Sequence, residues 1–122
     1  MSSISREYVK LADITVGTGT AYSNAINFRG LSAGCLIGAS GFGNASVTIE
    51  WNGNAINDVP DNSDTWYALK DPDNAAVAAA TVNAASADYM ELPATAYGKP
   101  WLRVKLGGNA ASDITISVYG AG

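Results

Sequence analysis

The sequence predicts an all-β protein, an antiparallel β-sandwich that is jelly-roll-like, with about eight to nine strands and little or no helix. The first observation behind this prediction is a hydrophobic period of two. Apolar and polar residues alternate over residues 47–52, 101–106 and 114–119. Such alternation is typical of a strand with one buried face. All three segments are rich in β-branched or aromatic residues, which pack well on a pleated surface.

The second observation is a series of turn signals at short spacing. Glycine, asparagine and aspartate accept the backbone conformations of tight turns. These signals lie at 17–19, 29–30, 41–43, 52–54, 71–74, 97–100 and 107–109. The weaker strands predicted between them cover residues 8–14, 25–28, 35–39, 66–69, 77–82 and 89–92. Many short strands separated by such turns favour a sandwich over a parallel sheet.

The alanine-rich segment 74–87 leaves two interpretations open. Alanine favours a helix, but the segment also holds β-branched residues and lacks a helix-capping pattern at its start. Strand and loop are therefore the favoured interpretation, and a short helix is the alternative.

A chain of 122 residues fits a single domain of ordinary size. We predict one sandwich domain over residues 8–122. Residues 1–7 are interpreted either as a frayed terminus or as a flexible arm that reaches a neighbouring subunit. We expect no signal peptide, because residues 1–10 lack an apolar core region. We also expect no membrane contact, because no apolar run approaches the ~18 residues of a membrane-spanning helix.

Charge is scarce and weakly acidic. Only 15% of the residues are charged, and the net charge is −4. The seven cations form no dense run, so direct binding to nucleic acid is not expected. A surface with few charges is easily desolvated, which suits lasting contact with another protein.

The sequence contains no histidine, which excludes histidine-based acid–base catalysis and the Ser-His-Asp triad. The single cysteine, Cys35, allows no intrachain disulfide and is predicted to be a small buried side chain rather than a reactive thiol. Glu50 and Glu91 are the acids inside strands, and nothing in the sequence places them together as a glycosidase pair. We predict no catalytic residues, no cofactor and no enzyme activity.

A cluster of aspartates raises the question of calcium. The cluster consists of Asp58, Asp61, Asp64, Asp71 and Asp73. Calcium needs several converging oxygen ligands, but the spacing matches no EF-hand loop. Aspartates also stabilise turns by bonding their own backbone. Solvated turn residues are the favoured interpretation, a calcium site in the Asp58–Asp73 loop is the alternative, and no metal ligand is assigned.

The aromatic residues also allow two interpretations. The candidates for a sugar-binding platform are Trp51, Trp66, Trp101, Tyr67 and Tyr97. Packing in the core and at interfaces is the favoured alternative, because tryptophan buries a large area. Alternation places Trp101, Arg103 and Lys105 on one strand face. Tryptophan and arginine are enriched at protein contacts, so these three residues form the candidate protein-contact face.

The second half of the chain resembles a group of small virion proteins of tailed bacteriophages. The resemblance covers roughly residues 20–119. It is carried by the strand and corner YMELPATAYG at 89–98, the strand KPWLRVKLG at 99–107, and the strand-and-turn VTIEWNG at 47–53. The Met-Pro-x-x-Trp segment that precedes this strand in the stronger members is absent here.

The resemblance implies a capsid cement, or decoration, protein. Such a protein would bind the major capsid protein on the outside of the expanded shell, where capsomers meet, and stabilise the shell. The resemblance also implies self-association as a homotrimer or homodimer, no cofactor, and a location on the virion after synthesis in the host cytoplasm. The alternatives are another phage structural component, such as a head fibre, tail or baseplate protein, and a carbohydrate-binding β-sandwich module.

Overall fold

The computed structural model describes residues 7–17, 19–39, 41–42, 45–70, 78–79, 88–107 and 114–122. This part of the chain forms antiparallel strands and one 3-10 turn, η1 (Ala94–Ala96). The strands are β1 (Val9–Val16), β2 (Ala21–Tyr22), β3 (Ile26–Asn27), β4 (Ala33–Gly38), β5 (Val47–Asn52), β6 (Tyr67–Ala68), β7 (Ala78–Ala79), β8 (Asp88–Glu91), β9 (Trp101–Leu106) and β10 (Ile114–Ala121). The all-β prediction is confirmed.

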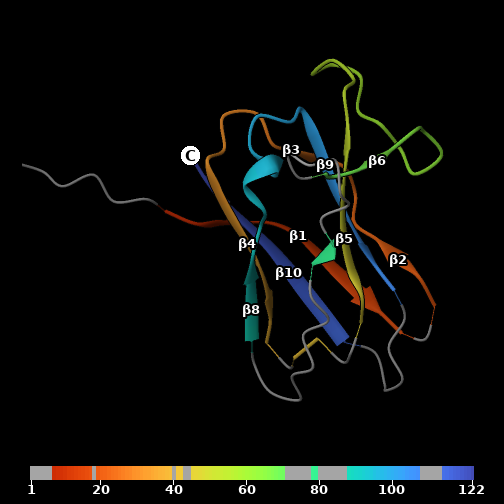
Figure 1. Ribbon diagram of the computed structural model, residues 1–122, viewed down its shortest axis with the longest axis vertical. Coiled ribbons are helices and arrows are strands. Elements are labelled where there is room, and N and C mark those ends of the chain that lie inside the picture. Colours follow the sequence, from red (N-terminus) through yellow and green to blue (C-terminus); the bar gives the residue numbers. More distant parts are fainter. Residues whose placement is uncertain are drawn as a thin grey trace, which may run out of the picture.

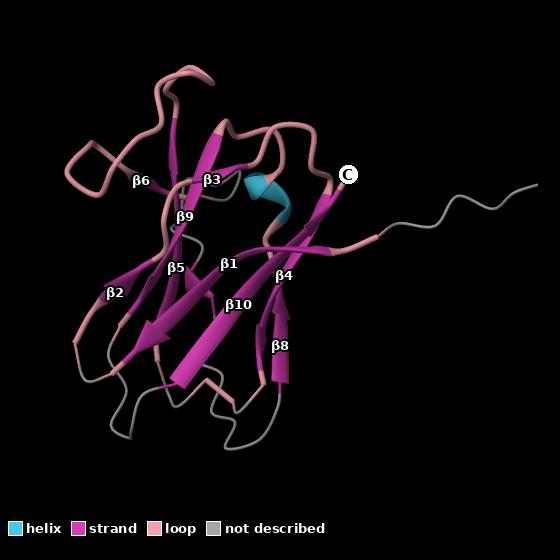
Figure 2. Ribbon diagram, turned by 180° about the vertical axis from the view of Figure 1, so that it is seen from behind, coloured by secondary structure: helices cyan, strands magenta, loops and turns pink. Residues whose placement is uncertain are grey.

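The strands form two sheets. Sheet A has the order β1-β10-β4-β8, and these four strands lie side by side in Figure 2. Sheet B has the order β2-β9-β5-β6, with β3 also paired to β9 and β7 also paired to β5. Figure 1 shows sheet B, with β5, β9 and β2, beside the strands of sheet A.

The pairing is that of a jelly roll. Strand β1 pairs with β10, β2 and β3 pair with β9, β4 pairs with β8, and β5 pairs with β6 and β7. With β2 and β3 taken as one interrupted strand, and β6 and β7 as another, eight strands form one long hairpin wrapped into two layers. The predicted sandwich with about eight to nine strands is therefore confirmed.

Several strand ends differ from the prediction. The short strand β2 was not predicted, because two residues are too few for a period to be visible. Of the segment 74–87, only Ala78 and Ala79 are described, and both pair with β5 as the favoured interpretation expects. The rest of that segment and residues 1–6 of the predicted arm lie outside the described residues.

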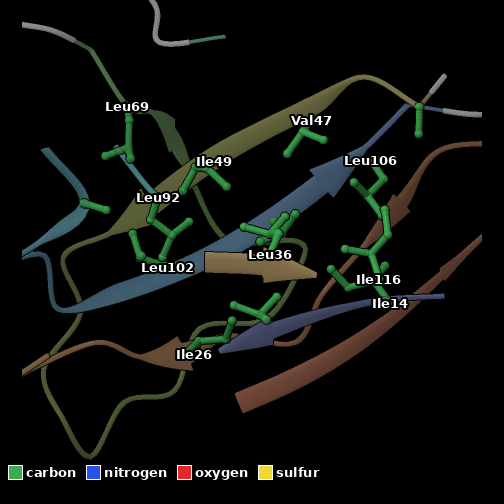
Figure 3. Close-up of a cluster of buried hydrophobic side chains, with 14 of the residues drawn as sticks. Ile14, Ile26, Leu36, Val47, Ile49, Leu69, Leu92, Leu102, Leu106 and Ile116 are labelled. Atoms are coloured by element: carbon green, nitrogen blue, oxygen red, sulfur yellow. The ribbon is translucent and has the colours of Figure 1, made fainter. Parts of the chain in front are cut away.

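The core lies between the sheets and follows the predicted alternation. In β9, Leu102, Val104 and Leu106 point inward and are buried, and β5 contributes Val47 and Ile49. The opposing side chains include Ile14, Leu36 and Ile116 from sheet A, which Figure 3 shows packed against them. Burying one such side chain contributes roughly 1.5–3 kcal/mol. The outward residues of the same strands are left to form the two outer faces.

Positive backbone φ angles support two of the predicted turns. Gly30 has a φ of 76° and Gly98 a φ of 88°. Non-glycine residues rarely adopt this conformation. The turns at 29–30 and 97–100 therefore need glycine for a conformational reason.

Gly38 allows us to test how tightly the β4 end is packed. A Cβ atom there would lie 2.6 Å from the backbone oxygen of Gly41. We expect Gly38→Ala to lower the free energy of unfolding by about 1–3 kcal/mol, because backbone must shift to make room. Urea unfolding measures the effect. Gly19→Ala is the control, since no atom lies within 4 Å of its Cβ position, and equal stability of the two variants would contradict the expected close contact.

Candidate docking surfaces

Arg103 is the centre of the outer face of sheet B. Its Nε donates a hydrogen bond to Glu50 Oε1 at 2.8 Å, and its Nη1 donates one to Asn62 Oδ1 at 3.2 Å. The guanidinium carbon lies 4.4 Å from the ring centre of Tyr22 and 4.7 Å from that of Trp66. Arg103 is consequently only 7% exposed although it points away from the core. This arrangement joins strands β5 and β9 to the loop between β5 and β6.

Trp101 fastens the other end of the same loop. Its indole Nε1 donates to the carbonyl oxygen of Asn54 at 3.0 Å. Arg29 Nη2 donates to the same oxygen at 2.7 Å, while its guanidinium lies 5.2 Å from the ring centre of Trp101. The β5–β6 loop (residues 53–66) is therefore tied down at both ends by side chains from other parts of the chain.

Two residues of the predicted contact face contact the chain's own β5–β6 loop. Trp101, Arg103 and Lys105 do share one face, as alternation predicted. However, Trp101 is 5% exposed and Arg103 is 7% exposed, and both contact the chain's own β5–β6 loop. Lys105 is half-buried, with its Nζ 6.0 Å from the ring centre of Tyr22. Contact between this face and another protein stays a prediction.

Within the loop, two aspartates build a turn. The backbone N–H and the hydroxyl of Ser63 both donate to Asp61 Oδ1, and the Asp61 N–H donates to Asp64 Oδ2. The Ser63 hydroxyl is the main reason why the pKa of Asp61 is lowered from its ordinary value. No group of three or more acidic, cysteine or histidine side chains in the described part of the chain could hold a metal ion. Asp71 and Asp73 lie outside that part.

The β5–β6 loop presents apolar side chains to solvent. Ile56 is 62% exposed and Val59 is 63% exposed. The loop appears in yellow-green to green at the upper right of Figure 1. Because Arg29, Trp101 and Arg103 already hold its backbone, little conformational entropy remains to be lost when a partner covers it. We call Ile56 and Val59 the loop tip.

A second exposed apolar surface lies on the outer face of sheet A. It is a hollow of about 510 Å³. We call it the tyrosine hollow, and its lining consists of Tyr8, Cys35, Ile37, Tyr89, Glu91 and Tyr119. Sequence reasoning did not identify it, because its residues come from separate strands. The visible indication was the presence of Tyr89 and Glu91 at outward positions of one strand.

A β-bulge shapes the outer face of sheet A next to the hollow. The register of β1 on β10 shifts between Lys10 and Ala12. Simple alternation would place Lys10 and Asp13 on opposite faces, but the extra residue turns both outward. Their side chains form an exposed ion pair at 3.3 Å. Lys10, at the β1 edge of this face, therefore already has an ion-pair partner.

Cys35 lies in the wall of the hollow and is half-buried rather than fully buried as predicted. Burial is the main cause that raises the pKa of its thiol, and the nearby Glu91 carboxylate raises it further. The thiolate is thus disfavoured, in agreement with the prediction of an unreactive side chain.

The five aromatic residues considered as a sugar platform do not share one face. Trp101 and Trp66 contact arginines on the outer face of sheet B. Trp51 lies 5.5 Å from Tyr67, centre to centre, on the core side of the same sheet. Tyr97 stacks on the buried Phe28 with ring centres 5.8 Å apart.

Removing Arg103 should release the β5–β6 loop. We expect Arg103→Ala to lower the free energy of unfolding by about 3–5 kcal/mol, because Glu50 would remain as a poorly exposed charge without its partner. Urea unfolding followed by tryptophan fluorescence measures this. Lys105→Met, on the same strand face, should change stability by less than about 0.5 kcal/mol. An Arg103→Ala protein as stable as wild type would contradict the tethering role.

The pKa of Cys35 predicts slow alkylation. Only the thiolate reacts, so a raised pKa leaves less of the reactive form at about pH 8 than in a free thiol. We expect iodoacetamide to label Cys35 more slowly than N-acetylcysteine, with the rate rising as pH increases toward the raised pKa. Glu91→Gln should accelerate labelling, whereas Asp58→Asn should not. Mass spectrometry follows the extent of labelling with time. If wild-type Cys35 reacts at the rate of the free thiol, the burial of this thiol is contradicted.

No helix in the part of the chain that the structure describes is long and apolar enough to cross a membrane. No protein-family model matches the chain, and neither a curated protein nor a solved structure matches it.

Proposed function

We propose that this protein is a structural virion protein that binds the outer surface of a phage capsid at capsomer junctions and stabilises the shell. The observation that carries the proposal is the presence of two separate exposed apolar surfaces on one small sandwich. The loop tip lies in the loop between β5 and β6 of sheet B, and the tyrosine hollow lies on sheet A.

The tyrosine hollow has the composition of a protein contact. Tyrosine is enriched at interfaces because its ring buries a large area while its hydroxyl keeps a polar contact. Covering apolar surface contributes about 25 cal/mol for each Å² removed from water. Tyr89 is 60% exposed and Tyr8 is 47% exposed, so a partner would bury much of both rings.

Two surfaces allow one molecule to bridge two neighbours. Once one surface is docked, the second meets its partner at a high effective concentration if that partner lies within reach. At a capsomer junction, that condition is met only in the assembled shell. A ligand that binds the shell and not the loose subunits stabilises the shell by mass action. The net charge of −4 adds no attraction to the packaged DNA.

Capsid decoration tests the proposal directly. Shells purified without this protein should bind the added protein and should then withstand a higher temperature before they release DNA. Ile56→Ser/Val59→Ser should weaken decoration strongly, because it removes both apolar side chains of the loop tip. Asn57→Ser is the matched control, since it changes an exposed residue of the same loop.

Cryo-electron microscopy of the particles identifies the site. Density on the shell at capsomer junctions supports the proposal. Density only on the tail, baseplate or fibres would contradict it and favour the second class of virion component. Equal heat resistance of shells with and without the bound protein would contradict the stabilising role.

A further inference from the structure

We propose that the tyrosine hollow takes an arginine side chain of the protein on which this chain docks. The identity of that docking partner rests on the proposed function. The affinity of the hollow for a guanidinium group does not.

The hollow combines aromatic rings with one carboxylate. Tyr119, Cys35 and Glu91 form a row across β10, β4 and β8, since Cys35 is the register partner of both others. Two strand spacings separate the ends of the row, roughly 10 Å. Ile37 and Tyr89 are paired in the same way two residues further along these strands. A negative group therefore stands at one end of an apolar, tyrosine-lined surface.

Glu91 has no cation partner within the described part of the chain. The ion pairs there join Lys10 to Asp13 and Arg103 to Glu50. Lys10 is opposite Tyr119 in the register of β1 and β10, but its ammonium group is 3.3 Å from Asp13 Oδ2. Among the described residues, the carboxylate of Glu91 therefore has no ion-pair partner.

The outer face of sheet B contains a filled example of the same chemistry. There, the Arg103 guanidinium lies between the rings of Tyr22 and Trp66 and forms an ion pair with Glu50. Sheet A offers tyrosine rings and a glutamate in a similar combination, without a described cation between them. The chain supplies its own arginine beside Glu50 on one face, and on the other face no described cation forms an ion pair with Glu91.

Arginine fits this surface better than lysine. Its planar guanidinium stacks on aromatic rings and binds a carboxylate through two parallel hydrogen bonds. It is also less strongly hydrated than an ammonium group, so its transfer onto an apolar surface costs less. The cation–π attraction of tyrosine adds to the ion pair with Glu91.

Amide NMR with N-acetyl-arginine amide as the probe tests the inference on the full chain. We expect saturable shifts at Cys35, Ile37 and Tyr119, with weaker binding at high salt because the site is open to solvent. N-acetyl-citrulline amide has the same shape without the charge, and should bind about tenfold more weakly or not at all. N-acetyl-lysine amide should also bind more weakly than the arginine probe.

Two variants test whether binding of the arginine probe depends on Glu91. Glu91→Gln should weaken the arginine probe about tenfold. Asp58→Asn changes the net charge by the same amount outside the hollow, and should leave the affinity unchanged. Equal affinity for the arginine and citrulline probes, or unchanged affinity in Glu91→Gln, would overturn the inference. Tighter binding of the arginine probe to the Arg6→Gln variant than to wild type would also overturn the inference. It would mean that the chain's own Arg6 competes with the probe for the hollow.

The two proposals fail in different ways. If the probe binds through Glu91 but shells are not decorated, the proposed function fails while the guanidinium site stands. If shells are decorated equally by wild type and Glu91→Gln, the arginine contact with the capsid fails while the proposed function stands. Loss of both arginine-probe binding and shell decoration in Glu91→Gln supports both proposals.

Discussion

The burial of one face of every long strand is the constraint on which the rest of this structure depends. Because neighbouring side chains point to opposite faces, filling the core with Leu102, Val104 and Leu106 forces Trp101, Arg103 and Lys105 outward. The same rule on sheet A turns Tyr89 and Glu91 away from the core. Both outer faces thus carry large amphipathic side chains as a direct consequence of how the core is filled.

The two outer faces accommodate these large amphipathic side chains in different ways. On sheet B, the β5–β6 loop covers Trp101 and Arg103 and supplies the carbonyl and amide oxygens that their N–H groups need. A buried guanidinium without such partners would be strongly destabilising, so the loop and the arginine depend on each other. On sheet A, the described part of the chain leaves the tyrosine hollow open. Within the described part of the chain, one face is covered by the protein's own loop and the other carries a hollow.

This difference between the two faces bears on the free energy of the proposed docking. The contacts of Arg103 hold the loop tip in place before any partner arrives, which lowers the entropy lost on binding. The tyrosine hollow is built on paired strands, so its backbone is also fixed in advance. Two separate, preformed surfaces suit the proposed link between neighbouring subunits of a symmetric assembly, where each contact is repeated many times.

Local pattern in the sequence determined the fold class, the inward residues of β5, β9 and β10, and the shared face of Trp101, Arg103 and Lys105, because alternation is a property of consecutive residues. Tertiary structure decided what those faces contact. Asn54 and Asn62 reach Trp101 and Arg103 across 47 and 41 positions of sequence, respectively. The tyrosine hollow gathers residues from β4, β8 and β10 with Tyr8. Pairing between distant strands leaves no period in a single sequence, so neither the covering loop nor the hollow could be predicted from it.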